Sequence, residues 1–276
     1  MKHAVNLVPG ACRRLATAGL CLSLAVPAGG MAQTNAPAEP KLWFHVGEEL
    51  VYSLYWGMLP IGETRVTTTW IDEEGQRRLQ IRDRTRSSKL IATLYPVDDV
   101  VEAIVDPVPF RSIRFTKNLK EGRHRYHEVT TFDYDRMTAH WESKITKEQK
   151  DYAIAADTRD LLTFMYYTRS QDIAAGAGKT YGIVADDKVY NVTYAIECVE
   201  GVKLGDYGSV PSFKIKPQTG FQGLFVHTGQ ILLWVSRDAR HLGTKVVGAT
   251  PVGHVRAVLS EVNGPGDDFW IRRGRE

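Results

Sequence analysis

Two pairs of neighbouring carboxylates are the first groups in this chain that could do chemistry. Asp98-Asp99 and Asp186-Asp187 have the residue types of a pair that shares one proton in general acid–base catalysis. Adjacent residues on a β-strand point to opposite faces of the sheet, so neither pair can bring its two carboxylates together. The two pairs therefore predict no acid–base site.

Three histidines, His124, His127 and His140, carry the side chain that metal ions bind most often. Residues three apart on a strand also point to opposite faces, so His124 and His127 cannot chelate one ion without a bulge. The chain contains no His-Glu-x-x-His motif. We interpret these histidines as solvated strand residues, and we predict no metal and no cofactor.

One further segment and one cysteine carry residue types that occur in phosphate-binding or catalytic sites, but neither lies in the sequence context that such a site needs. Ala175–Thr180 ends like a phosphate-binding loop, but Ile173 stands where the upstream glycine is needed, and the segment follows an expected helix rather than a strand. We interpret it as a helix end and turn. Cys198 lies in an apolar strand, where we expect it to be a buried thiol. No Gly-x-Ser-x-Gly motif is present, and no catalytic residue is predicted.

The aromatic residues allow two interpretations. They pack in the core, which is the default for an aromatic content of 10%, or some of them line a cavity for an apolar ligand. The glycine-containing segment Thr219–Phe225 is the expected rim of such a cavity. The residues predicted to bind the ligand are Trp56, Trp70, Phe164, Tyr167, Phe221, Phe225 and Trp234.

The elements that must position these side chains are mostly strands. Polar and apolar residues alternate with period two through most of the chain, and Gly, Pro and Asp turns join the segments, which predicts an antiparallel meander. The expected strands include Leu50–Trp56, Thr64–Trp70, Val97–Asp106, Phe110–Lys120, Arg123–Tyr134, Met137–Lys144, Thr180–Val184, Val189–Val199, Ser212–Lys216, Ile231–Ser236, Lys245–Thr250 and His254–Val262.

One helix is expected within this strand pattern, from Thr158 to Ala174. Asp157 is predicted to cap it, Asp160 lies in its first turn, and Gly176 is expected to close it. The helix is apolar around most of its circumference, so it should be buried against the sheet. The predicted fold is mainly β (α+β): a strongly curved antiparallel sheet or half-open β-barrel that encloses one long helix.

The first 32 residues predict export. Lys2, Arg13 and Arg14 precede an apolar run, Leu15–Val26, and small residues follow, which is the layout of a cleavable signal peptide. Residues 1–32 hold three Lys and Arg and no acid, so the processed chain carries 32 Lys and Arg against 32 Asp and Glu. This neutral balance argues against a nucleic-acid partner.

The expected organisation is a signal peptide at 1–32, a flexible linker at 33–42, a single β-rich domain at 43–263 and a C-terminal tail at 264–276. Outside the signal peptide, no stretch reaches the roughly 18 consecutive apolar residues of a membrane-spanning helix. We therefore expect a periplasmic protein without a transmembrane segment in its processed form.

Several segments carry a resemblance to a known family. They are Phe44–Tyr52 with Trp56-Gly57 and Gly62, then Asp160-Leu161-Leu162 with Tyr167 and Arg169, and finally Trp234–Asp238 leading to Gly253-His254-Val255. In this order and spacing they resemble the exported bacterial family known as domain of unknown function 3108. The resemblance implies no assigned reaction or cofactor, and an architecture similar to the half-open β-barrels of periplasmic lipoprotein carriers.

The chain departs from the family pattern in two places. Arg237-Asp238 stands where the family usually has Asp-Asp, and Leu242-Gly243 stands where a proline often follows. Asp160 and Arg169 match family positions. Nine residues apart on the expected helix, they are interpreted, with Asp157, as structural cap and anchor residues rather than as an acid and a base.

Three functions remain open on these grounds. The first is noncatalytic binding of an apolar or amphiphilic envelope ligand, such as an acyl chain or a lipoprotein anchor. The second is an envelope assembly or interaction factor that binds a protein or polymer through the basic strand faces around Arg78–Arg86 and Arg111–Arg125. The third is an envelope hydrolase, for which the sequence offers no nucleophile, base or metal ligand set.

Overall fold

The computed structural model describes residues 40–219, 231–250 and 253–265. The expected signal peptide lies outside the described residues, as do residues 33–39 of the expected linker and the expected tail from residue 266 onward. Pro40–Glu276 forms one compact unit. None of the described helices is long and apolar enough to span a bilayer.

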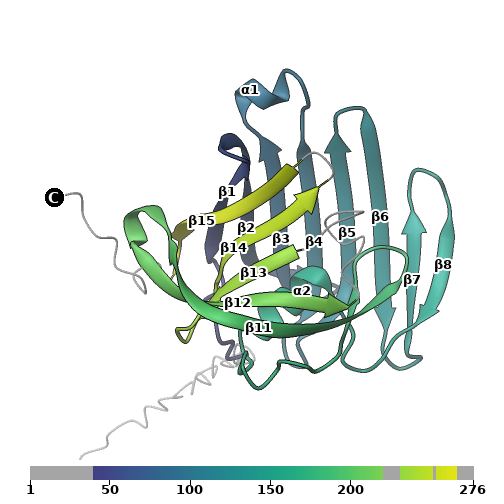
Figure 1. The fold of residues 1–276 in the computed structure, drawn as a ribbon. Helices are drawn as coiled ribbons and strands as arrows, with labels where there is room; N and C mark the ends of the chain where they lie inside the picture. The colour runs from purple at the N-terminus through teal and green to yellow at the C-terminus, as the bar shows by residue number, and fades with distance from the viewer. Residues whose placement is uncertain (1–39, 220–230, 251–252, 266–276) are drawn as a thin grey trace, which may run out of the picture. The chain divides into compact units, whose positions relative to one another are not determined.

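The described strands join into a single sheet, in the order β8-β7-β6-β5-β4-β3-β2-β1-β15-β14-β13-β12-β11-β10-β9 (Figure 1). The strands are β1 (Glu49–Trp56), β2 (Leu59–Glu73), β3 (Gln76–Ser87), β4 (Asp98–Asp106), β5 (Arg111–Glu121), β6 (His124–Asp133), β7 (Thr138–Ser143), β8 (Gln149–Ala153), β9 (Arg159–Asp160), β10 (Tyr181–Val184), β11 (Val189–Lys203), β12 (Ser209–Thr219), β13 (Ile231–Ser236), β14 (Gly243–Thr250) and β15 (Gly253–Asn263). Three short helices accompany them: α1 (Lys89–Ala92), α2 (Leu161–Thr168) and the single 3₁₀ turn η1 (Gly205–Tyr207).

The strand pairs are antiparallel except for the short pair β9–β10. Consecutive strands are neighbours along both halves of the sheet, and β1 in the centre pairs with both β2 and β15. Successive side chains of a strand point to opposite faces of the sheet. On β3, Leu79 and Ile81 are fully buried, whereas Arg78 faces outward. The expected mainly β, antiparallel architecture is confirmed.

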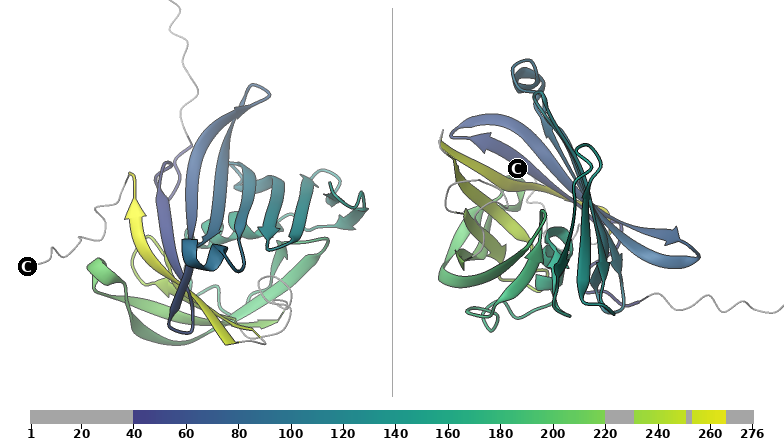
Figure 2. Two further views of the ribbon diagram at one scale, coloured as in Figure 1. Left: turned by 90° about the horizontal axis from the view of Figure 1, so that it is seen from above. Right: turned by 90° about the vertical axis from the view of Figure 1, so that its right-hand side faces the viewer.

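The sheet is strongly bent (Figures 1 and 2). Strands β2–β8 form one wall, and β11–β15 turn away from it so that they pass on the other side of α2. Irregular register in several strands, including the steps at Val51/Tyr52, Ile104/Val105 and Trp234/Val235, provides the local bends that a curved sheet needs. The sheet ends at β8 and β9, which do not pair, so the barrel is not closed.

Residues 154–158 connect the two ends of this sheet, β8 and β9, and side-chain contacts rather than strand pairing hold the ends together. Ala139 of β7, Ile154 after β8 and Val184 of β10 share a small buried cluster. Nearby, the Lys150 ammonium lies 2.9 Å from the Asp187 carboxylate. The half-open barrel therefore has a seam that is held by packing and ion pairing.

The helix is much shorter than the sequence predicts. Thr158 is buried and Arg159–Asp160 form β9, so α2 begins at Leu161, and its N-cap is Asp160 rather than Asp157. The Asp160 carboxylate accepts hydrogen bonds from the Thr163 amide (2.9 Å) and hydroxyl (2.5 Å). It also accepts one from the Ser112 hydroxyl of β5, which joins the helix start to the wall.

The C-terminal end of α2 also differs from the prediction. The helix stops at Thr168, and Arg169 is its C-cap, so Gly176 does not close it. Four residues later the Asp172 carboxylate accepts hydrogen bonds from the amides of Ala174 (2.9 Å) and Ala175 (3.1 Å). The amides of Arg169, Ser170 and Gln171 each donate to the carbonyl three residues back, so the chain leaves the α-helical pattern before Asp172, and the Asp172 bonds hold the turn that follows.

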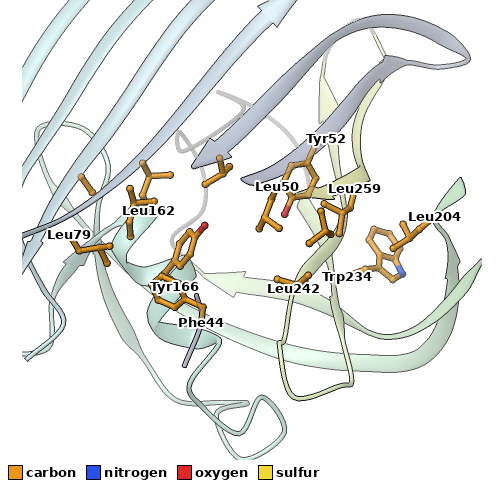
Figure 3. Packing of buried hydrophobic residues seen from close by; sticks show 14 of the residues in the cluster. Phe44, Leu50, Tyr52, Leu79, Leu162, Tyr166, Leu204, Trp234, Leu242 and Leu259 are labelled. Carbon is orange, nitrogen blue, oxygen red and sulfur yellow. The ribbon is translucent and has the colours of Figure 1, made fainter. Parts of the chain in front are cut away.

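The main core lies between the wall and the curved half of the sheet (Figure 3). Leu162 and Tyr166 of α2 meet Leu79 of the wall on one side, and Leu242 and Leu259 belong to the same cluster on the other. Each fully buried leucine contributes roughly 2 kcal/mol relative to an exposed one. The single buried helix, although short, thus connects both halves of the sheet.

The outer face of the wall carries a ladder of cross-strand ion pairs. Arg78 lies 2.7 Å from Asp106, Arg84 lies 2.9 Å from Asp98, and Arg114 lies 2.5 Å from Glu73. Arg82 and Glu102 add a looser pair at 3.5 Å. The basic strand faces that the sequence predicts are therefore largely neutralised by acids on neighbouring strands.

Asp83 on β3 predicts an unusual dependence of stability on pH. Burial raises its pKa from 3.8 to about 6, although the Thr64 hydroxyl donates to the carboxylate and partly offsets this. The folded state therefore holds a proton that the unfolded chain has lost, and stability falls as the pH rises from about 4 to about 6.

Replacing Asp83 with Asn should remove this loss and raise the free energy of unfolding at pH 7 by about 1 kcal/mol, since the side chain keeps some solvent contact. Urea unfolding at pH 4 and pH 7 measures the effect. The exposed Asp135→Asn is the control and should leave the pH dependence unchanged. An Asp83→Asn variant that is less stable than wild type at pH 7 would show the prediction to be wrong.

Candidate functional site

A cavity of about 510 Å³ opens between the end of β11 with η1 and the strands β1, β14 and β15. This volume lies within the usual range of small-molecule sites. The lining is mixed: charged and hydroxyl side chains are interspersed with Val202, Val258 and Leu259. The cavity is the candidate functional site of the described part of the chain.

Cross-strand pairing brings the lining side chains to one face of the sheet. Ser53 of β1 lies opposite Val258 of β15, which in turn lies opposite Lys245 of β14. Tyr55 of β1 lies opposite Arg256 of β15. Direct partners on neighbouring strands point to the same face. Three strands that are far apart in sequence therefore contribute to one side of the cavity.

The other side is formed by the turn around η1. Leu204 is fully buried, and its amide donates to the Gly208 carbonyl at 2.8 Å, which tightens the turn. Tyr207 is also buried, and its hydroxyl accepts a hydrogen bond from the Val262 amide at 2.9 Å. These contacts fix the turn against β15 and hold Lys203 at the cavity.

Positive charge predominates in the lining. Lys203, Lys245 and Arg256 contribute three cations, against the two acids Glu200 and Asp206. The three cations come from β11, β14 and β15, so their positions are set by the fold rather than by one flexible loop. A cavity of this kind can bind an anionic group.

Two aromatic rings orient these charges. Trp234 is buried, its indole nitrogen donates to Glu200 at 2.5 Å, and the Lys245 ammonium lies 4.2 Å from its ring centroid. The Arg256 guanidinium lies 4.7 Å from the ring centroid of Tyr55. Cation–π contact at these distances stabilises each charge and restricts its side chain.

A second polar cluster is fully enclosed and has a structural role. Arg169 at the end of α2 donates to both carboxylate oxygens of Glu48, at 2.5 and 3.0 Å, and Arg240 after β13 donates to one of them as well. The Tyr166 hydroxyl donates to the same carboxylate at 3.3 Å. Glu48 has no exposed surface, and Arg169 has almost none. This cluster connects the start of β1, the end of α2 and the β13–β14 turn.

The charges in this cluster compensate for their burial. Burial by itself would raise the pKa of Glu48, but the hydrogen bonds and charges of Arg169 and Arg240 outweigh it and hold the pKa below 4.5. Burial would lower the pKa of Arg169, but the bond to Glu48 raises it above its ordinary value. Both groups are therefore ionised at neutral pH.

Comparison with known proteins agrees with this arrangement. The sequence model of the family described as "Protein of unknown function (DUF3108)" matches residues 51–260. The chain belongs to this family. No curated protein matches the chain. A solved structure similar to this DUF3108 protein is the crystal structure of a beta-barrel-like protein of domain of unknown function DUF1849 from Brucella abortus.

That likeness concerns the fold alone. The TM-score is 0.54 at 11% sequence identity, and the match covers 79% of this chain and 97% of the other. The expected family and the beta-barrel-like architecture are thus confirmed. The segments on which the resemblance rests also meet in space: Glu48, Arg169 and the turn after Trp234 join at the buried cluster.

The structure does not bring the predicted ligand-binding aromatics together. Trp234 packs in the core beneath the cavity, and Trp56 is exposed at the end of β1. Trp70 and Tyr167 are partly buried beside the main core. Phe164 packs on Tyr181, with the two ring centroids 5.3 Å apart. None of these five lines the cavity. Phe221 and Phe225 lie outside the described residues.

Sequence reasoning missed the cations of the cavity and the partners of Glu48. Nothing local distinguishes Lys245 or Arg256 from any other outward residue of an alternating strand. Only the register of β14 and β15 reveals them. Cys198 corrects another expectation, because it is exposed rather than buried. The register shifts between Ile196 and Cys198, and such a bulge turns the side chain to the other face.

The described residues contain no group of three or more His, Cys, Asp or Glu that is arranged to hold a metal ion. The cavity itself has no cysteine or histidine in its lining. Its lining offers cations, two acids, hydroxyl groups and apolar side chains.

Proposed function

We propose that this DUF3108 protein is an exported, noncatalytic binding protein of the cell envelope. In this proposal the cavity takes the anionic head of an amphiphilic ligand. The observation that carries the proposal is the convergence of Lys203, Lys245 and Arg256 from three strands on one cavity of about 510 Å³. The signal-peptide pattern at residues 1–32 supports export.

The apolar part of the lining favours an amphiphile over a small inorganic ion. Val202, Val258 and Leu259 lie beside the charged groups, so a ligand with both an anionic and a hydrocarbon part satisfies more of the surface. The hydroxyl-bearing side chains of Ser53 and Tyr55 add hydrogen-bonding groups. This anionic amphiphile is a narrower ligand class than the apolar or amphiphilic ligand that the sequence predicts.

The two other functions have less support. The arginines of the wall, which motivate a polymer-binding surface, are mostly engaged with acids on neighbouring strands. The cavity lining has two acids and two serines but no histidine or cysteine to activate a nucleophile. Ligand binding therefore accounts best for the site.

Charge reversal in the cavity should weaken binding of an anionic amphiphile. We expect Lys245→Glu to bind lysophosphatidylglycerol about ten-fold or more weakly than wild type, because a favourable charge becomes a repulsive one. Isothermal titration calorimetry below the critical micelle concentration measures this. The wild type should have a lower affinity for lysophosphatidylcholine than for lysophosphatidylglycerol. The affinity for lysophosphatidylcholine should be similar in the wild type and in Lys245→Glu.

The control for this experiment is Lys179→Glu, an exposed lysine in the turn before β10 that is not part of the cavity lining. It should bind as the wild type does. Equal affinity of wild type and Lys245→Glu for lysophosphatidylglycerol, or the absence of any binding, would refute the proposed site.

A further inference from the structure

One end of the sheet concentrates exposed apolar side chains. Of the twelve large apolar side chains that are exposed in the described residues, eight lie at the end formed by the β1–β2, β3–β4, β5–β6 and β7–β8 connections, which places them on one rim. They are Trp56, Met58, Leu59, Leu90, Leu94, Tyr95, Tyr126 and Ile145. Figure 1 shows α1 at this end, above the strands. We call these eight residues the apolar rim.

The most exposed members stand on the tips of the connections. Met58 is 90% exposed, Leu94 is 84% exposed and Leu90 is 70% exposed. Residues 54–62 around the β1–β2 turn contain no charged side chain. Scattered single apolar residues are normal on a protein surface, but eight of the twelve exposed large apolar side chains of the described residues lie at this one end of the sheet.

The rim is held in place by the backbone. The Ser88 amide donates to the Ile61 carbonyl at 2.8 Å, which fixes the start of α1 to β2. On the other side, the Gly122 amide donates to the Pro96 carbonyl at 2.8 Å, and the Tyr95 ring lies so close to Gly122 that a side chain there would clash. Leu90 and Leu94 are thus presented by a fixed connection.

Positive charge lies beside two of the four connections of the rim, β3–β4 and β5–β6. Residues 84–99 and 118–126 together hold six Lys and Arg against three Asp and Glu, a net charge of +3. Arg123 and Arg125 are exposed on the β5–β6 hairpin. A shallow cavity of about 290 Å³ under α1 is lined by Arg86, Lys120 and Arg125, with Asp98 as the one acid.

Two of the three acids in residues 84–99 and 118–126, Asp98 and Asp99, are engaged. Asp98 pairs with Arg84 at 2.9 Å and with Arg86 at 3.3 Å. Asp99 accepts a hydrogen bond from the Lys120 amide at 2.7 Å. On the β5–β6 hairpin the Arg125 guanidinium donates to the Gly122 and His124 carbonyls, which are neutral groups and leave its positive charge unbalanced.

From these observations we propose that the apolar rim docks onto a lipid surface that carries anionic headgroups. Side chains that protrude singly from separate tips enter a bilayer interface, where no complementary shape is needed, and lysines and arginines set behind them meet the headgroup charges. Aromatic residues such as Trp56 and Tyr95 suit the headgroup level. The occupant is a membrane, and the cavity of the proposed function is a separate site.

Vesicle sedimentation tests the proposal with the chain from Gln33 onward, which keeps the whole compact unit Pro40–Glu276. Vesicles of equal parts phosphatidylcholine and phosphatidylglycerol should bind the protein, and binding should weaken with added salt. The double variant Leu90→Ser and Leu94→Ser should bind about ten-fold more weakly. The double variant Arg123→Glu and Arg125→Glu should lose the preference for phosphatidylglycerol over pure phosphatidylcholine.

Two controls isolate the rim. Val108→Ser removes an apolar side chain that is 80% exposed at the opposite end of the sheet, and it should leave vesicle binding unchanged. Lys245→Glu in the cavity should also bind vesicles normally, which separates this proposal from the proposed function. Normal vesicle binding by the leucine variant overturns the proposal. Self-association that is lost in the leucine variant, without vesicle binding by the wild type, overturns it too.

Discussion

Glu48→Gln is expected to lower the free energy of unfolding at pH 7 by about 3–5 kcal/mol. The substitution removes the carboxylate that Arg169 and Arg240 share and leaves two buried guanidinium groups without their counterion. Breaking a buried ion pair from one side is costly because the remaining charge cannot return to water. Urea unfolding, with the slope of the transition checked for constancy, measures the loss.

The neighbouring residue gives a matched control. Glu49 pairs with Arg65 at 3.0 Å, but both side chains are about one-third exposed. Glu49→Gln should therefore cost less than about 1 kcal/mol. If the two glutamine variants are equally stable, the buried cluster does not stabilise the fold in the way that its geometry indicates.

The effect of Glu48→Gln should depend on pH. Because the folded-state pKa lies below 4.5, the stabilisation is present above the unfolded-state pKa and is lost as the pH falls through the folded-state value. The difference in stability between wild type and Glu48→Gln should accordingly be largest near pH 7 and should shrink in acid.

Asp160→Ala is the second change with a large expected effect, a loss of about 3 kcal/mol. It removes the N-cap of α2, and it also leaves the Thr163 amide and the buried Ser112 and Thr163 hydroxyls without their acceptor. Because α2 connects the two halves of the sheet, the variant should still unfold in one cooperative transition, with its midpoint at a lower urea concentration than that of the wild type.

The other N-cap provides the comparison. Ser88 caps the short, exposed helix α1, and Ser88→Ala should cost only about 0.5–1 kcal/mol. Asp160→Asn should cost less than Asp160→Ala, since the amide oxygen can still accept from Thr163. Burial raises the pKa of Asp160, so the neutral amide also avoids enclosing a charge. Equal losses for Ala and Asn would show that the cap contributes little.

The sequence predicts the strands well because their pattern is local. The expected strand Ile231–Ser236 coincides with β13, and Val97–Asp106 differs from β4 by one residue. By contrast β8, Gln149–Ala153, has one partly buried side chain and no alternation, since it is an edge strand in solvent. An edge strand without a buried face leaves little trace in hydrophobic periodicity.

The candidate site could not be predicted for a different reason. Its cations belong to strands whose register is set by pairing across the whole chain, and Glu48 meets Arg240 at a separation of 192 positions. The prediction of the helix length was wrong for a local reason. The residue pattern suggested a helix to Ala174, but the Asp172 carboxylate accepts a hydrogen bond from the Ala174 amide in the turn that follows α2. Many of the aromatic residues pack in the core and others are exposed on strand ends, so their abundance does not reveal the cavity.

The place of β1 has a consequence for how the polypeptide reaches its native state. This strand pairs on one edge with β2, which follows it directly, and on the other with β15, the last described strand. Its second edge stays open until residues 253–263 have left the ribosome, and Arg240, one of the two counterions of Glu48, is synthesised only shortly before them. The central strand can therefore be fully paired only after β15 has been made, and a nascent chain stopped before β15 presents an unpaired strand edge to chaperones.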